Sequence, residues 1–192
     1  GLGVPQLVRR SGALRVAEVV SEVPGQAGAV VLDLGFETRV QVTLTGVGGA
    51  LAAGDLVQVA VSGTRGTRVA AAQRGYFYDG ALERVVDGDT VIAVVALGCG
   101  VTRRMRVRLK GVDAAPIETA SGKEADALVC KRLKPGDPVV LETFRADPYG
   151  RYLAHVFYWG SRRREKASAE TILDKGRFLN QELLDAGLAV AR

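Results

Sequence analysis

The sequence predicts a mainly β protein of the α+β class, made of two small β-barrel-like modules with two or more helices beside the second. Three observations lead to this prediction. Short runs of β-branched residues are bounded by Gly and Asp, a similar set of runs recurs later in the chain, and helical spacing is confined to two segments. The chain has 192 residues and 47% hydrophobic content, which is enough for two small domains that bury a core.

The two sets of strand-like runs follow one another in the same order. Each set ends in a Gly-Asp pair and a further apolar run, at Gly54-Asp55 and at Gly136-Asp137. The alternatives are an internal duplication, or a coincidence between two small barrels that are both rich in Gly, Ala and Val. We favour two modules, residues 1–75 and 76–192, the first being a reduced form of the second. The corresponding runs are 12–16 and 80–86, 29–35 and 91–98, and 42–47 and 107–112.

Two helices are expected in the second module. The first lies in an insertion at residues 113–135, where Ser121 is the expected N-cap and Glu124 completes a capping box. The second covers 178–186, with Gly187 as its C′ residue. The polar segment 159–175 reads as a loop, and its Arg162-Arg163-Arg164 run has at most a supporting role in phosphate contact. The apolar stripe of the first helix consists of Ala125, Leu128, Val129 and Leu133.

Composition excludes several classes of function. The net charge of +5 suits a polyanionic partner such as nucleic acid. Cys99 and Cys130 form no C-x-x-C pair, so a structural zinc site is not expected. His155 lies in an apolar run and is expected to be a packed strand residue, which leaves serine–histidine catalysis without support. No stretch is apolar enough to span a membrane, and a removed N-terminal signal would make the protein secreted or part of the cell envelope.

Acidic and arginine residues recur at the ends of the expected strands in the second module. Asp87-Gly88-Asp89 alone is typical of a hairpin turn. Arg108 and Asp113 close the next strand region, however, and Arg151 follows a later turn. Neighbouring carboxylates form a hard oxygen site for a divalent cation, calcium above all, and two guanidinium groups can hold one phosphate by forked hydrogen bonds. Together these groups indicate phosphodiester hydrolysis.

Five motifs in this order resemble the staphylococcal nuclease (thermonuclease) family over about residues 76–192. The resemblance implies a five-stranded OB-fold barrel with helices beside it. It also implies a calcium-dependent hydrolase of DNA or RNA, acting as an endo- or exonuclease. The motifs are Val-Asp-Gly-Asp-Thr-Val, Val-Arg-Leu-x-Gly-Val-Asp-Ala, Gly-x-Glu-Ala, Asp-x-Tyr-Gly-Arg-x-Leu-Ala, and Leu-Asn-x-x-Leu before a final Gly-Leu-Ala.

The same resemblance implies roles for individual residues. Asp89 and Asp113 would be direct calcium ligands, with Asp87 farther out and the Ala114 carbonyl as a backbone ligand. Arg108 and Arg151 would bind the scissile phosphate, and Tyr149 would line the nucleotide pocket. Single-stranded DNA or RNA is the expected partner, and the sequence does not fix the oligomeric state.

One departure from the family pattern bears on catalysis. The family continues Asp-(Ala/Thr)-Pro-Glu, and its glutamate activates or positions the attacking water. In an ungapped match Pro116 occupies that position, whereas a small loop rearrangement would let Glu118 reach the water. Two hypotheses follow: a calcium-dependent nuclease that uses Glu118, and a catalytically impaired domain that binds nucleic acid or protein. The joint presence of the acids and both arginines favours the enzyme.

Overall fold

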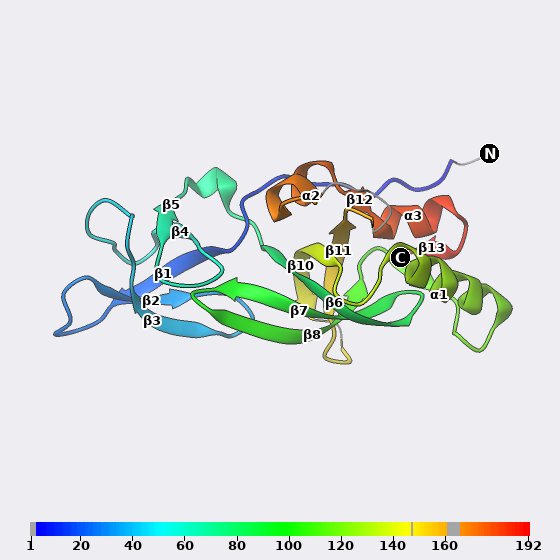
Figure 1. Ribbon diagram of the computed structural model, residues 1–192, viewed down its shortest axis with the longest axis horizontal. Coiled ribbons are helices and arrows are strands. Elements are labelled where there is room, and N and C mark those ends of the chain that lie inside the picture. Colours follow the sequence, from blue (N-terminus) through cyan, green and yellow to red (C-terminus); the bar gives the residue numbers. More distant parts are fainter. Residues whose placement is uncertain (1–2, 147, 161–165) are drawn as a thin grey trace. The chain divides into compact units, whose positions relative to one another are not determined.

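The computed structural model describes residues 3–146, 148–160 and 166–192, and the chain divides into two compact units (Figure 1). The first unit contains the N-terminal segment up to Ser11, residues Asp79–Val95 and residues Arg104–Arg192. The second contains Gly12–Tyr78 and Ala96–Arg103. That these units fold as separate domains, divided near residue 75, stays a prediction.

The first unit is built on a closed five-stranded barrel, which confirms the expected OB fold. The strands follow the order β10-β6-β7-β8-β11, and pairing between β10 and β11 closes the barrel. Strands β8 and β11 run parallel, whereas the hairpin partners β6 and β7 are antiparallel. The bounds are β6 (Phe77–Asp87), β7 (Thr90–Gly98), β8 (Val101–Leu109), β10 (Pro138–Ala146) and β11 (Tyr152–Tyr158).

Short strands extend this barrel, and its interior is aliphatic. Strand β12 (Arg177–Phe178) pairs with β11, and β9 (Val112–Ala114) pairs with β13 (Ala189–Ala191). Apolar residues on both faces of these strands are buried, because α2 packs on β10 and α3 packs on β11. The fully buried ones include Val95, Val107, Val140, Leu141, Ala154 and Val156.

Helix α1 (Ala120–Arg132) has the expected apolar stripe, but it begins earlier than expected. The N-cap is Thr119, and the prediction of Ser121 was wrong. The Thr119 hydroxyl accepts a hydrogen bond from the Gly122 amide at 3.0 Å and donates one to the Pro116 carbonyl at 2.7 Å. This second bond links the cap to the turn three residues earlier, so the local turn at Pro116 favours Thr119 over Ser121 as the N-cap.

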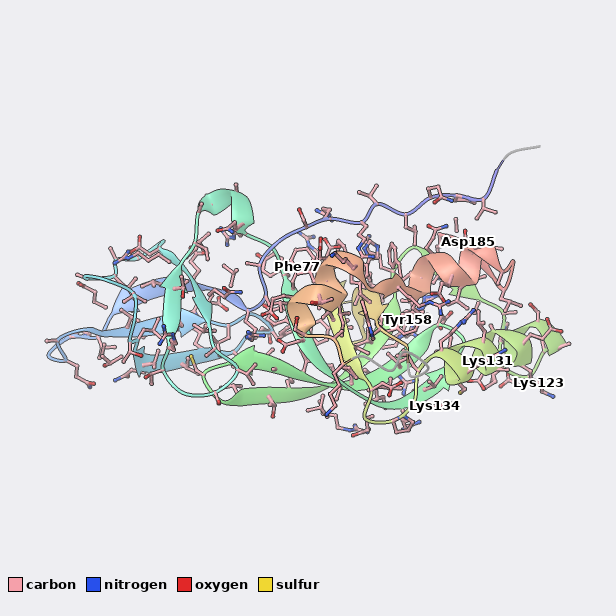
Figure 2. The ribbon with its side chains drawn as sticks, turned by 45° about the horizontal axis from the view of Figure 1, so that its top comes forward. Phe77, Lys123, Lys131, Lys134, Tyr158 and Asp185 are labelled. Atoms are coloured by element: carbon pink, nitrogen blue, oxygen red, sulfur yellow. The ribbon has the colours of Figure 1, made fainter. Side chains whose placement is uncertain are left out.

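The exposed side of α1 is basic. Figure 2 labels Lys123 and Lys131 on the helix and Lys134 just beyond it, all of them exposed. Lys134 donates from Nζ to the Cys130 carbonyl at 2.6 Å, as expected for a cation that caps a helix C-terminus.

The segment 159–175 is not only a loop, as the sequence led us to expect. It contains α2 (Ala169–Lys175), whose N-cap Ser168 accepts from the Thr171 amide at 3.1 Å. Buried Ile172 and Leu173 anchor this short helix. The Arg162-Arg163-Arg164 run lies outside the described residues.

The last helix, α3 (Leu179–Asp185), matches the expectation. Gly187 has a positive φ of 69° just past its end, where a left-handed residue terminates a helix. Tyr158, which is labelled in Figure 2, donates to Glu182 at 2.7 Å and so ties β11 to α3.

The N-terminal segment is held on the first unit by side chains from distant parts of the sequence. Arg9 donates to the carbonyls of Gly176, Ile172 and Leu173 at 2.6, 3.1 and 2.7 Å, and its guanidinium lies 4.5 Å from the centre of the Phe157 ring. These carbonyls lie at the C-terminal end of α2, where helix carbonyls run out of helical donors, and that of Ile172 also accepts from the Gly176 amide at 2.8 Å. A single arginine therefore caps this helix.

Arg10, the next residue along, forms an ion pair. It contacts buried Glu142 at 3.0 Å, and Glu142 also lies 3.1 Å from His155 Nδ1. His155 is buried as expected and packs edge-on against Phe144 and Phe178.

Replacing Arg9 with alanine is expected to lower the free energy of unfolding by about 2–3 kcal/mol, because three carbonyls lose a charged donor. Urea unfolding monitored by circular dichroism measures the change. Arg84→Ala is the matched control, since Arg84 is an exposed arginine of the same unit. Equal midpoints for the two variants would contradict this role of Arg9.

The second unit is a five-stranded sheet of the order β3-β2-β1-β4-β5. A parallel bridge between Thr45 and Arg65 connects the segments beside its outer strands, with the Thr45 amide donating to the Thr64 carbonyl at 2.8 Å. The order β3-β2-β1-β4-β5 corresponds to β8-β7-β6-β10-β11 in the barrel. The parallel pairing of β8 with β11 has its counterpart here in the single Thr45–Arg65 bridge. The bounds are β1 (Val16–Glu22), β2 (Ala29–Asp33), β3 (Arg39–Thr43), β4 (Leu56–Val59) and β5 (Gly66–Arg68), followed by a 3-10 turn at Ala71–Gln73.

The two Gly-Asp corners have the same hydrogen bonds. The Gly54 amide donates to Val19 O at 2.8 Å and the Val19 amide to Asp55 O at 2.9 Å. Likewise, the Gly136 amide donates to Leu82 O at 2.7 Å and the Leu82 amide to Asp137 O at 2.9 Å. The strands are bulged next to Val19 and next to Leu82. This agreement supports an internal duplication.

The correspondence also corrects the alignment of the first strand. Matching run 12–16 with run 80–86 on their Gly-Ala-Leu letters pairs Leu14 with Leu82. In the structure Val19 is the counterpart of Leu82, because the two residues make equivalent hydrogen bonds at the two Gly-Asp corners. The Gly12-Ala13-Leu14 run precedes β1 and is not part of it.

Candidate active site

The Asp87-Gly88-Asp89 turn joins β6 to β7 and lies against α1 and β9. A Cβ atom added to Gly88 would lie 2.6 Å from the Ala125 Cβ and 3.1 Å from the Ala114 Cβ. Glycine is therefore required here by the close approach of the helix. The turn is held by a hydrogen bond of 3.1 Å from the Asp89 amide to Asp87 Oδ1.

Arg108 bridges two aspartates that come from different elements. Its Nη2 atom lies 2.6 Å from Asp113 Oδ1 and 3.3 Å from Asp89 Oδ2. The same Asp89 oxygen accepts a hydrogen bond from the Ala114 amide at 3.0 Å. Arg108 and Asp89 are only 7% and 8% exposed, so their positions are constrained by packing. The structure thus brings together Asp89, Arg108, Asp113 and Ala114.

The pKa of the Asp89 carboxyl is raised, chiefly by burial. The nearby Asp87 raises this pKa further, while the Ala114 amide and the Arg108 charge lower it. The net pKa of Asp89 is raised, which shows that the surrounding positive charge does not fully compensate its desolvation.

A further acid, Asp126, lies near this turn and was missed by the sequence reasoning. Burial raises the pKa of Asp126, and the charge of Asp87 raises it in addition. The available signal was its position on α1, directly after the Ala125 that packs on Gly88. Acids therefore outnumber the buried arginine around the turn, which favours a cation.

The donors fit a hard divalent cation in type and charge. Asp89 and Asp113 each direct an oxygen at one point, and carboxylate oxygens are what calcium prefers. The Arg108 guanidinium occupies that point. Within residues 3–146, 148–160 and 166–192, no group of three or more His, Cys, Asp or Glu side chains has the geometry of a metal site. A bound cation would require Arg108 to exchange these carboxylates for another anion.

Arg151 and Tyr149 lie at the start of β11, beside β8. In the parallel register Leu153 pairs with Arg108, and side chains two residues apart share a face, so Arg151 lies on the face that carries Arg108. The Arg151 guanidinium is 5.2 Å from the centre of the Tyr149 ring, which is 82% exposed. Asp147 of the same motif lies outside the described residues.

Glu118 is not part of this cluster. It is exposed in the turn before α1, and in the described part of the chain it makes no hydrogen bond or ion pair. Two hydrogen bonds close this turn, in which the Pro116 carbonyl accepts from both the amide and the hydroxyl of Thr119. The structure therefore joins the acids with Arg108 and leaves Glu118 on the surface.

The closed five-stranded barrel defines the first unit as an OB-fold domain, with acids and arginines gathered at its strand ends. Residues 106–192 match the family model described as staphylococcal nuclease homologue. The match is consistent with a staphylococcal nuclease-like domain in this part of the chain. The matched range contains Arg108, Asp113 and Arg151, whereas Asp87 and Asp89 precede it.

None of the curated proteins matches the chain. Across the described residues, no helix combines the length and the apolar character needed to cross a membrane.

Proposed function

We propose that the first unit is a calcium-dependent nuclease that hydrolyses phosphodiester bonds in DNA or RNA. The observation that supports this proposal best is the position of Arg108, whose guanidinium is buried between Asp89 and Asp113. A confined guanidinium is pre-oriented for the charge that develops on a phosphate in the transition state. The positive net charge of the chain favours the same polyanionic substrate.

Different side chains would bind the cation and the phosphate. Asp89, Asp113 and the Ala114 carbonyl would hold calcium, with Asp87 farther out. When bound, calcium supplies Lewis-acid stabilisation of the phosphate charge. Arg108 then turns its donors to the phosphate oxygens, and Arg151 on the neighbouring strand provides a second guanidinium. Exposed Tyr149 offers a ring on which an unpaired base can stack, which favours single strands.

In this proposal Glu118 positions the attacking water, and the turn that carries it must move toward the acids when substrate binds. A second function, binding of nucleic acid or protein without turnover, is favoured by one observation. Glu118 is exposed and forms no hydrogen bond or ion pair with the Asp89–Arg108–Asp113 cluster, and in an ungapped match Pro116 falls at the position of the family's glutamate. Loss of a general base costs on the order of 10²–10⁴-fold in rate.

Cleavage of labelled single-stranded DNA and RNA, with calcium and with a chelator, separates these functions. Calcium-dependent cleavage supports the nuclease, and its absence for every oligonucleotide overturns it in favour of binding. Glu118→Gln is expected to lower kcat on the order of 100-fold. Glu124→Gln, another exposed acid close by on α1, is the control. Equal rates for the two variants would exclude Glu118 as the base.

A further inference from the structure

Strand β8 carries a row of cations on its outer face. Met105, Val107 and Leu109 point into the core and are buried, so the alternating residues between and beside them point outward. Outward residues on one strand recur roughly every 6.5 Å. This repeat is close to the separation of successive phosphates along an extended nucleic acid strand. The row consists of Arg104, Arg106, Arg108 and Lys110.

Three of these four cations already have partners. Arg104 is neutralised by Glu83, with hydrogen bonds of 2.6–2.9 Å to both carboxylate oxygens. Arg108 bridges the aspartates described above, and the Lys110 ammonium lies 4.6 Å from the centre of the Phe144 ring. Arg106 differs from them, because it is exposed and makes no hydrogen bond or ion pair with any described residue.

The neighbouring strand adds a second positive charge beside Arg106. Tyr152, the first residue of β11, pairs with Val107, and continuing this register by one residue places Arg151 beside Arg106. Two guanidinium groups on one face favour an anionic ligand, and a phosphate group can accept hydrogen bonds from both.

We propose that Arg106 binds the phosphate adjacent to the one at Arg108, so that the outer face of β8 guides a single-stranded nucleic acid through the site. This inference rests on the proposed function, which places the scissile phosphate at Arg108. The alternative is that Arg106 belongs to a solvated face and contacts no ligand.

The test is the salt dependence of binding to a fluorescent oligothymidylate, measured by anisotropy in chelator so that turnover does not interfere. Arg106→Ala is expected to reduce the slope of log K against log salt by about one and to raise Kd roughly tenfold at low salt. Arg106→Lys, which keeps the charge, is expected to restore most of the slope. The control is Arg39→Ala, which removes the same charge from an exposed site in the second unit.

The two proposals fail in different ways. If the wild type cleaves with calcium but Arg106→Ala has the slope and Kd of Arg39→Ala, the inference is wrong and the nuclease proposal stands. If the wild type does not cleave but Arg106→Ala selectively loses slope, the contact is supported and hydrolysis is overturned. Equal slopes in all variants would assign Arg106 to a solvated face.

Discussion

Replacing Arg108 with alanine is expected to lower kcat/KM for phosphodiester cleavage on the order of 10²–10³-fold, the typical effect of removing one preorganised transition-state donor. The guanidinium is 7% exposed and lies between Asp89 and Asp113, so its removal takes away a buried donor whose position is constrained by packing. The measurement is the initial rate of calcium-dependent cleavage of a single-stranded oligonucleotide.

The same substitution leaves the two aspartates without their shared counter-charge. A modest loss of stability is therefore expected, and urea unfolding separates it from the loss of chemistry. Arg108→Lys keeps one charge but cannot form a forked contact, so it is expected to recover stability more fully than rate. Arg84→Ala is the control for removal of an exposed arginine. Full activity in Arg108→Ala would exclude the proposed phosphate site.

Replacing Gly122 with alanine is expected to reduce the free energy of unfolding by about 3 kcal/mol, at the upper end of the usual cost of overpacking. The added Cβ would lie 1.9 Å from the Pro116 oxygen, 2.5 Å from the Pro116 carbonyl carbon and 2.7 Å from the Ala115 oxygen. All three are backbone atoms, so no side-chain rotation relieves the contact. The helix must shift, or the Ala115–Pro116 segment must.

Either shift moves the turn that connects Ala114 to Glu118, so activity is expected to fall together with the midpoint of thermal unfolding. Gly3→Ala is the matched control, because a Cβ at Gly3 meets no atom within 4 Å and its φ is not positive. An unfolding midpoint for Gly122→Ala equal to that of Gly3→Ala would show that the turn packs less closely on α1 than described.

Features encoded by local patterns were predictable from the sequence. The apolar stripe of α1 predicted its buried face, and Gly187 predicted the end of α3. Both predictions depend on neighbouring residues alone. Thr43 and Arg108 occupy the same position in the matched runs 42–47 and 107–112. The structure supports this match, because Gly46 and Gly111 each follow three residues later with φ of 82° and 78°. Thr43 cannot bridge two acids, which is consistent with the absence of an acidic pair from the corresponding turn of the second unit.

Features decided by distant contacts were not predictable. Helix α2 is short, and its end is capped by Arg9, which lies 167 residues before Gly176 in the chain. No local signal in the α2 segment indicates this partner. The Thr119 cap was missed for another reason, since it depends on the turn at Pro116, three residues earlier. At the candidate site, the sequence identified the acids and arginines, but not that Arg108 would contact Asp89 and Asp113 directly or that Asp126 would lie beside Asp87.

The contacts of Arg9 constrain the order in which the chain can fold during synthesis. Its acceptors, the carbonyls of Ile172, Leu173 and Gly176, are made 163, 164 and 167 residues later. While the ribosome builds the intervening residues, the segment that carries Arg9 has no docking site, and the first unit has only part of its surface. The first unit therefore cannot complete its fold until α2 has emerged from the ribosome. The Gly12–Tyr78 part of the second unit is synthesised long before α2.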